Sequence, residues 1–249
     1  LMIPRTISHI WIGPYPRPTE WMTTWPEFHQ DWHYTIFDNE TLSSKKWIFQ
    51  KHIEEYLKRG CYSGVADLMR YQILFEQGGF MPGADTVCLK RIDCLFKEET
   101  AYSVCENEIF CPNLISPVLA CPPGNEFVGR IISELEKISP KDMRDAWITT
   151  GNLLMGYLYK KHPNQLIVFP SHFFIPKHYT GIYSDRDSDV YAKQFFGTGT
   201  NSYKKVKRGL FQKRLQRRMS RQREKYASQA LKKSDVKNIP WLKAENWEL

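Results

Sequence analysis

The sequence predicts an α/β domain followed by a basic extension, and three observations carry that prediction. The chain has 249 residues, enough for one large domain with a substantial core. Hydrophobic residues make up 42% and aromatic residues 14% of it, a composition typical of globular rather than disordered proteins. Its N-terminal part alternates strand-like and helix-like segments, which favours α/β over α+β architecture.

The first elements follow from the hydrophobic pattern and the turn residues. Residues 7–13 (ISHIWIG) alternate β-branched and other apolar side chains, which predicts a buried strand ending at Gly13. The next expected elements are a proline-rich loop, a helix over 21–28, a strand over 32–40 that leads to Asp38, and a helix over 45–59 closed by Gly60.

Residues 63–79 (SGVADLMRYQILFEQGG) contain the clearest helix. Ser63 can cap its start, Gly78 stands where a left-handed C-terminal residue is favoured, and no glycine or proline follows Gly64 in its interior. The later elements are expected to be a strand over 86–89, short strands around a Cys-Pro-Asn turn within 101–120, helices over 126–138 and 145–160, and a strand over 166–170. Residues 185–203 are polar, and we expect them to be irregular.

The positive charge is concentrated in one segment. The net charge is +8, but residues 204–233 hold 13 Lys and Arg against one acid, which leaves 22 basic and 26 acidic residues elsewhere. This distribution weighs against a nucleic-acid-binding body and favours an acidic partner for the tail alone. The six cysteines form no Cys-x-x-Cys pair and the histidines show no metal-site spacing, so we expect buried free thiols and a reducing, cytoplasmic compartment.

Candidate functional side chains occur in the clearest helix and just after it. Asp67, Arg70 and Tyr71 lie at i, i+3 and i+4, so they share one helix face. That face fits either a surface ion pair or a ligand site, in which the aspartate accepts from sugar hydroxyls and the arginine meets a phosphate. The segment GGFMPGADTVCL then presents Asp85 on a tight turn, where a carboxylate can hold a divalent cation that bridges to phosphates.

These motifs occur in an order that resembles the DXD sugar-binding glycosyltransferases (glycosyltransferase family 32), the family of the yeast initiating mannosyltransferases. The family pattern joins a Ser-Asp-x-x-Arg-Tyr helix to a Gly-Gly-x-Tyr-x-Asp-x-Asp turn, and this chain has SGVADLMRYQILFEQGGFMPGAD. The segments IPRTISHIWIG, CPNLISPVLACPPGNEF and TTGNLL also resemble family segments in the same order. The likeness covers most of residues 3–203.

The resemblance implies a GT-A-type nucleotide-binding sandwich with a mixed central sheet over residues 1–203, plus a basic, helical extension over 204–249. It implies retaining transfer of a sugar from a UDP- or GDP-sugar to a hydroxyl of a glycan or glycolipid acceptor, with Mn²⁺ or Mg²⁺ as cofactor. Asp67, Arg70 and Asp85 would then be the catalytic residues, with Asp85 as the metal ligand. The substrate-binding residues would be Ile10, Trp11, Tyr71, Gly83, Ala84, Asn113, Lys204 and Lys205. For Asn113, a turn-forming role after Cys-Pro is an equal alternative.

Three metal-associated features depart from the family pattern. Gly83 stands where the family has its first aspartate, Met81 replaces a tyrosine, and the closing segment over 191–203 (YAKQFFGTGTNSY) lacks a His-His-Trp-x-Gly-Ser-Trp type sequence. One interpretation is a metal-independent site, in which lysines such as Lys193, Lys204 and Lys205 neutralise the diphosphate. The other is an inactive protein that binds sugar nucleotides or glycans as a scaffold or regulator.

The basic tail carries its own alternatives. Phe211, Leu215 and Met219 recur at steps of four among Lys and Arg, which predicts a basic amphipathic helix. Such a helix can lie on an anionic membrane surface through residues 204–233, at the inner face of a membrane where a polysaccharide or glycolipid is assembled, or it can pack on the domain. Nucleic-acid binding by the tail is a third alternative, weakened because few aromatic residues lie among the basic ones.

Overall fold

The computed structural model describes residues 2–109, 111–183, 189–197 and 239–242. The helices are α1 (Thr19–Met22), α2 (Thr24–Phe28), α3 (Asn39–Ser44), α4 (Gln50–Lys58), α5 (Tyr62–Gln77), α6 (Glu126–Glu136), α7 (Ala146–Thr149) and α8 (Asn152–Lys161). The strands are β1 (Thr6–Ile10), β2 (His33–Phe37), β3 (Gly79–Phe80), β4 (Thr86–Cys88), β5 (Ala101–Asn107), β6 (Cys111–Ile115), β7 (Ala120–Cys121), β8 (Leu166–Phe169) and β9 (Ala192–Gln194). Short 3-10 turns lie at Pro140–Asp142, Pro163–Gln165, Ser171–Phe173 and Pro240–Leu242.

A mixed central sheet organises these elements, as predicted for an α/β domain. Its strand order is β2-β1-β3-β7-β5-β6, with β8 also paired to β5. Strands β1, β2 and β3 run parallel, whereas β7 is antiparallel to both β3 and β5. Strand β8 is parallel to β5, and β6 is antiparallel to it. Antiparallel β4 and β9 form a separate two-stranded sheet.

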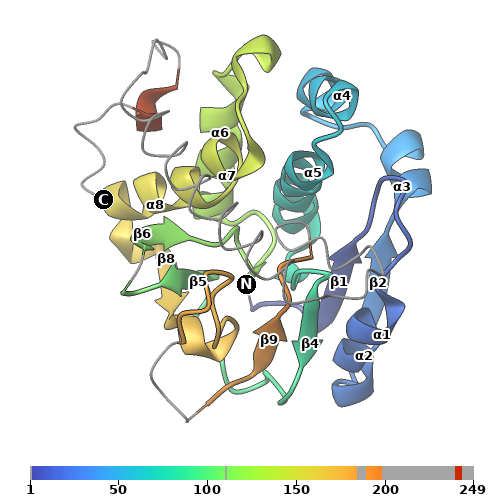
Figure 1. Ribbon diagram of the computed structural model, residues 1–249, viewed down its shortest axis with the longest axis vertical. Coiled ribbons are helices and arrows are strands. Elements are labelled where there is room, and N and C mark those ends of the chain that lie inside the picture. Colours follow the sequence, from blue (N-terminus) through green and yellow to red (C-terminus); the bar gives the residue numbers. More distant parts are fainter. Residues whose placement is uncertain (1, 110, 184–188, 198–238, 243–249) are drawn as a thin grey trace, which may run out of the picture.

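The central sheet separates two hydrophobic cores. Helices α4, α5, α6 and α8 gather on one side of it in Figure 1, and their apolar faces form the larger core. The smaller core, on the other face, is largely aromatic and includes Trp25, Phe80 and Tyr102. Neighbouring strand residues alternate between the cores: Ala101 belongs to the first and Tyr102 to the second. This alternation is what a sheet buried on both faces requires.

Most of the predicted elements are confirmed, with shifted ends. The expected strand over 32–40 ends at Phe37 because Asp38 caps a further helix, α3, accepting from the Thr41 backbone N–H at 3.2 Å. Gly78 has a φ of +66° at the end of α5, as predicted. The Ser63 cap was wrong, because α5 already begins at Tyr62, after Cys61. The helix expected over 145–160 is divided into α7 and α8.

Two predictions about the later strands were also wrong. Pro112 and Asn113 lie inside β6 rather than in a turn. Strand β6 ends the strand order of the sheet, and an edge strand tolerates a proline that donates no ladder hydrogen bond. The strand expected over 86–89 exists as β4, but its partner β9 lies in the segment predicted to be irregular.

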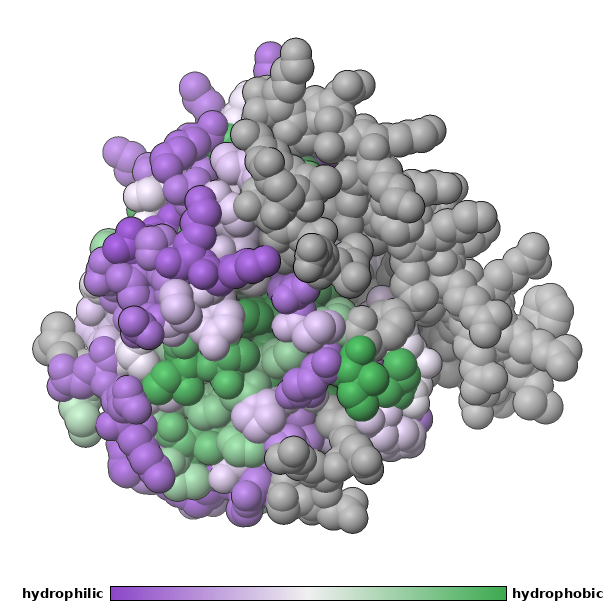
Figure 2. Space-filling view, turned by 90° about the vertical axis from the view of Figure 1, so that its left-hand side faces the viewer, coloured by the Kyte–Doolittle hydropathy of each residue, from purple (hydrophilic) through white to green (hydrophobic). Residues whose placement is uncertain are grey.

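All six cysteines are free thiols, and Cys88, Cys105, Cys111 and Cys121 are buried, whereas Cys61 is half-buried and Cys94 exposed. No helix among the described residues combines the length and apolar character needed to cross a bilayer. The predicted basic helix, with Lys204 and Lys205, lies outside the described residues. In Figure 2, hydrophobic residues gather in the middle of the face shown and hydrophilic residues border them.

Candidate active site

The carboxyl end of β1 is the first feature that positions a site. The chain passes from β1 to β2 on one side and later returns to β3 on the other side of β1. In open α/β sheets, ligands bind outside the carboxyl ends of strands at such a switch point. Buried Ile10 is the last residue of β1, and half-buried Trp11 follows it at this end of the sheet.

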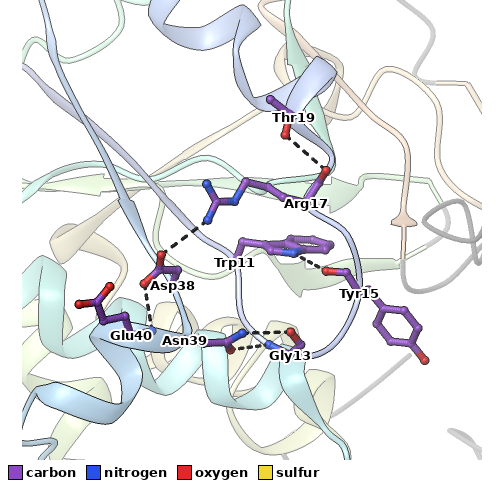
Figure 3. A pocket seen from close by; sticks show the side chains of 8 residues that line it. All are labelled: Trp11, Gly13, Tyr15, Arg17, Thr19, Asp38, Asn39 and Glu40. Carbon is purple, nitrogen blue, oxygen red and sulfur yellow. Dashed lines mark hydrogen bonds and ion pairs between the residues drawn. The ribbon is translucent and has the colours of Figure 1, made fainter.

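A pocket of about 360 Å³ opens at this edge (Figure 3). Its lining residues come from the segment after β1 and from the start of α3: Trp11, Gly13, Tyr15, Arg17, Thr19, Asp38, Asn39 and Glu40. The Asn39 side chain holds the Gly13 backbone twice, because its Oδ1 accepts from Gly13 N at 2.8 Å and its Nδ2 donates to Gly13 O at 3.1 Å. The side chain of Asn39, the first residue of α3, therefore fixes the pocket wall at Gly13.

The pocket combines an aromatic ring with charged groups. The indole Nε1 of Trp11 donates to the carbonyl of Tyr15 at 2.9 Å, which fixes the ring against the proline-rich loop. Arg17 approaches Asp38, with 3.6 Å between Nη2 and Oδ2. A flat ring with nearby carboxylates and amides suits a ligand that has an aromatic base and hydroxyl groups, since stacking and hydroxyl hydrogen bonds are then both provided.

Helix α5 connects this pocket to the predicted acid–arginine face. Gly13 has a φ of +97°, and a Cβ there would lie 2.9 Å from the ring of Tyr62, the first residue of α5. Only glycine permits this approach of the helix to the pocket wall. Asp67, Arg70 and Tyr71 follow within the next turns of the same helix.

Asp67 is held by the link between α7 and α8. Its Oδ2 accepts from the Thr150 hydroxyl at 2.8 Å, and the Tyr71 hydroxyl donates to the carbonyl of Thr150 at 2.5 Å. Burial raises the pKa of the Asp67 carboxyl from 3.8 to about 7, and the charge of Arg70 and the Thr150 hydrogen bond oppose this only in part. Near neutral pH this group is a mixture of acid and carboxylate, so it can either donate to or accept from a substrate hydroxyl.

Arg70 ties α5 to the strands beside it. Its Nη1 donates to the carbonyl of Val118 at 3.0 Å and also to the carbonyl of Met81. Among the residues that the structure describes, its buried Nε finds no hydrogen-bond partner. The guanidinium therefore fixes the backbone ahead of Asp85 and supplies positive charge to both Asp67 and Asp85.

Asp85 lies on the turn that precedes β4. The carbonyl of Gly83 accepts from both the backbone N–H and the hydroxyl of Thr86, the latter at 2.7 Å, which closes the turn. Half-buried Gly83 and Ala84 lie within this turn. Burial raises the pKa of Asp85, while a backbone N–H from Gly197 and the charge of Arg70 oppose that shift.

The segment after β9 reaches Asp85. Asp85 O accepts from Phe195 N at 2.8 Å, and Asp85 Oδ2 accepts from Gly197 N at 2.9 Å. Stacking of Phe195 on Trp21, with ring centroids 4.6 Å apart, packs this segment against α1. Exposed Lys193 lies in β9 with its Nζ over the Phe195 ring.

Three residues that the sequence did not single out complete the surroundings. Asn152, two residues after the Asp67 partner, donates from Nδ2 to Glu106 Oε2 at 2.6 Å. Glu106 Oε1 lies 2.9 Å from His178 Nε2. The His178 ring then contacts Phe196, beside Gly197, at a centroid distance of 5.8 Å.

These contacts form a chain that leads from Asp67 to Asp85, and the charge of Arg70 acts on both acids. The chain of contacts passes through Asp67, Thr150, Asn152, Glu106, His178, Phe196, Gly197 and Asp85. Among the residues predicted from sequence, Asp67, Arg70, Tyr71 and Asp85 are therefore brought together. Trp11 lies in the neighbouring pocket, and half-buried Asn113 lies in β6, two residues after Cys111.

The described residues around Asp85 do not fit a divalent cation. Gly83 offers no ligand, and one Asp85 oxygen already accepts from Gly197. In the described part of the chain, Asp85 belongs to no group of three His, Cys, Asp or Glu side chains that could share an ion. Manganese and magnesium prefer several oxygen ligands, so this turn lacks the donor set for a tightly held metal.

Sequence spacing could not reveal Glu106, Asn152 and His178 as neighbours, because they come from β5, α8 and a loop far along the chain. One signal was present: TTGNLL contains both Thr150 and Asn152, which contact acids on different elements.

Comparison with known proteins gives only distant structural similarities. No protein-family model and no curated protein matches the chain. A solved structure described as "PaToxG Glycosyltransferase" aligns with a TM-score of 0.49 and 13% identity over 66% of this chain and 70% of that chain. A second, a glycosyltransferase involved in the glycosylation of the major capsid of PBCV-1, aligns with a TM-score of 0.41 and 12% identity over 77% of this chain and 94% of that one. Similarities this distant do not assign an activity, which has to be argued from the geometry.

Proposed function

We propose that this chain is a GT-A-type glycosyltransferase that moves a sugar from a nucleotide diphosphate to an acceptor hydroxyl, with retention of configuration. The observation that carries the proposal is the gathering of Asp67 and Asp85 around the charge of Arg70, on the helix whose first residue packs on the pocket at the carboxyl end of β1. A nucleotide sugar needs both parts: an aromatic pocket for its base and a polar region for its sugar and diphosphate.

In this proposal the nucleoside occupies the pocket. Trp11 stacks on the base, and Asp38 accepts from the ribose hydroxyls in place of its long contact with Arg17. The donor sugar then lies against the α5 face, where Asp67 binds a sugar hydroxyl. Arg70 holds the loop carrying Asp85 in place through the Met81 and Val118 carbonyls.

The diphosphate is bound with weak or no dependence on metal in this proposal. Departure of the sugar leaves negative charge on the nucleotide, and that charge has to be stabilised. Lys193 of β9 and the lysines that follow, including Lys204 and Lys205, are proposed to supply the positive charge. Because position 83 carries no carboxylate, Asp85 is the one acid of this turn that would repel the phosphates. One oxygen of Asp85 accepts a hydrogen bond from the Gly197 N–H.

Calorimetry with a panel of UDP- and GDP-sugars tests the proposal directly. Each donor is titrated with manganese, without metal and with chelator, and its slow hydrolysis is followed by the release of free sugar. We expect one donor class to bind, with hydrolysis unchanged by chelator. Absence of binding to every donor would refute the proposal, and strict manganese dependence would refute its metal-independent form.

Restoring the missing acid gives a sharper test of the metal. The backbone at Gly83 is outside the left-handed region, and the atom nearest to a new Cβ is the movable Asp85 Oδ1 at 2.9 Å. Gly83→Asp is therefore expected to fold and to create a pair of carboxylates that binds manganese. Gly83→Asn, of similar size but without charge, is the matched control. Equal manganese affinity in the two variants would contradict this account of the turn.

A catalytically silent binding protein is the second candidate, and one observation favours it. Gly83 removes one acid, and a backbone N–H already satisfies one oxygen of the other. Such a protein would bind a sugar nucleotide in the calorimeter and hydrolyse none of it. Binding with no hydrolysis for every bound donor would select this candidate over the enzyme.

The acceptor is proposed to be a glycan or glycolipid at the inner face of a membrane. The basis is the basic segment over 204–233, whose charge suits anionic lipid. Replacing Arg214, Arg217, Arg218 and Arg221 with glutamine keeps Lys204, Lys205 and the largely buried residues 239–242, and it is expected to weaken association with anionic liposomes while donor binding stays measurable. Unchanged liposome binding would reject the membrane part of the proposal and leave the enzymatic part standing.

A further inference from the structure

A second group of side chains beside the candidate active site offers metal ligands of mixed chemistry. Glu106, Cys111 and His178 each place one ligand atom within 4.8 Å of the other two. Cys111 and His178 are buried, and the Glu106 side chain is only 14% exposed. These residues come from β5, from the start of β6 and from the loop after Phe173.

The β5–β6 pairing explains how the glutamate and the cysteine come together. Cys105 pairs with Ile115, whereas Asn107 pairs with Cys111, so the register shifts at the position of Glu106. Side chains of neighbouring strand residues normally point to opposite faces. A bulge changes that direction, and bulges occur often beside functional sites.

Outer partners orient two of the three ligands. His178 Nδ1 lies 2.7 Å from the Thr180 hydroxyl, which can accept a hydrogen bond from Nδ1 when Nε2 binds a metal in place of its contact with Glu106. Asn152 holds the other oxygen of Glu106 at 2.6 Å. Histidine and carboxylate ligands of protein metals usually have such outer hydrogen bonds. The rings of Tyr179 and Phe196 pack against His178 and add an apolar surround.

We propose that Glu106, Cys111 and His178 bind a zinc ion, with water at the fourth position. A set of one oxygen, one nitrogen and one sulfur ligand suits zinc better than magnesium or manganese, which prefer oxygen. Zinc bonds of about 2.0–2.3 Å separate tetrahedral ligands by roughly 3–4 Å, so small side-chain adjustments suffice. The ion replaces the contact between Glu106 and His178 and takes the Cys111 ligand as thiolate, releasing its proton to solvent.

This zinc would clamp the β5–β6 hairpin to the loop that carries His178. The same loop contacts Phe196, which precedes the Gly197 partner of Asp85. The ion therefore stabilises the contacts that lead from His178 through Phe196 and Gly197 to Asp85. This inference does not depend on the proposed function, because it concerns ligands that lie outside the Asp67–Arg70–Asp85 set.

Cobalt substitution in the full chain tests the site. The protein is stripped with chelator and titrated with Co²⁺, and the absorption spectrum is followed. We expect one tetrahedral cobalt per chain, with a thiolate-to-cobalt charge-transfer band that zinc displaces. Cys111→Ser is expected to remove that band. Cys88→Ser, which removes another buried thiol from β4, is expected to keep it.

Two further variants separate this site from general effects on folding. Asn152→Ala keeps all three ligands and is expected to weaken zinc binding by roughly 10- to 100-fold, as loss of an outer partner does. Asp85→Asn is expected to leave the cobalt spectrum unchanged. If Cys111→Ser fails to fold, Glu106→Gln supplies the ligand deletion, and circular dichroism verifies the fold of each variant. Absence of cobalt binding, or an unchanged charge-transfer band in a folded ligand variant, would overturn the proposal.

Discussion

Asp67 and Asp85 are two half-buried acids beside the same arginine, yet the chain holds them in different ways. Asp67 is in the middle of a long helix, and its partner is the side-chain hydroxyl of Thr150. Asp85 is on a turn, and its partner is a backbone N–H from a segment more than a hundred residues later. A regular helix sets the backbone position of Asp67 locally, although its Thr150 partner lies 83 residues away, whereas both the turn and the partner of Asp85 depend on the remote β4–β9 pair. The site therefore has one part on α5, whose backbone is set by helix geometry, and one part at Asp85, which forms only when β4 pairs with β9.

Arg70→Leu should give the largest effect, because Arg70 lies between the two parts. The change removes the positive charge that stabilises the carboxylate form of Asp67. It also leaves the Met81 and Val118 carbonyls without the donor that Arg70 provides. Leaving a buried acceptor without its donor typically costs about 1–3 kcal/mol of unfolding free energy, and Arg70→Leu does this to two carbonyls. Chemical denaturation measures this loss. Arg130→Leu is the control, because Arg130 pairs with Glu126 on the surface. Similar losses for both variants would show that Arg70 is no more than an ordinary surface arginine.

Asp67→Asn should reduce activity more than stability. The variant keeps the size of the side chain and its contact with Thr150, but it loses the charge and proton exchange expected to act on the donor sugar. Donor hydrolysis is expected to fall by roughly 100- to 1000-fold, the range for loss of one stabilising group at a reacting centre. Glu76→Gln, on the same helix but paired with Lys45, should leave the rate unchanged. A wild-type rate in Asp67→Asn would remove Asp67 from the catalytic set.

The α5 part of the site could be predicted from sequence, because its geometry is local. The i, i+3, i+4 spacing of Asp67, Arg70 and Tyr71 determines a shared helix face, and Gly78 has the positive φ expected at the helix end. Asp85 was predicted as a site residue from its tight turn beside a strand, and the family resemblance added to that prediction. Its contact with Gly197 could not be derived, because β4 leaves the central sheet and pairs with β9.

Several errors have the same physical origin. Propensity placed Asn113 in a turn after Cys-Pro, but pairing with β5 keeps Pro112 and Asn113 in an edge strand. The TTGN segment looked like part of one helix, but the chain breaks there so that Thr150 and Asn152 contact two different acids. Tertiary contacts override local preference at these positions. His178 joins Glu106 and Cys111 for the same reason, although the spacing of the histidines indicated no cluster.

Trp11→Ala should weaken donor binding by a smaller amount. Stacking of a base on an aromatic side chain contributes about 1–3 kcal/mol, so the dissociation constant is expected to rise by roughly 5- to 150-fold. Calorimetry measures it, and Trp11→Phe is the control that keeps an aromatic ring. If the alanine and phenylalanine variants bind the donor equally, the base does not stack at Trp11. The nucleoside would then have to be assigned to another part of the site.

The smallest expected effect is the pH dependence of stability that comes from Asp67. Its folded-state pKa of about 7 exceeds its usual 3.8, so the folded state binds this proton more tightly than the unfolded state does. The contribution to unfolding free energy is therefore fully present below about pH 4, and it is lost as the pH rises through about 7. Asp67→Asn lacks this dependence, so its Tm relative to wild type should be higher at about pH 8 than at about pH 4.

Glu76 should behave in the opposite way: burial alone would raise its pKa, but hydrogen bonds from Lys45 and Gln72 lower it. Glu76→Gln should therefore lose stability relative to wild type as the pH rises from the lowered pKa of Glu76 to the usual pKa of glutamate, and the deficit should stay constant above it. Parallel curves for the two variants would contradict the assignment of Asp67 as the acid of α5 that binds its proton more tightly on folding.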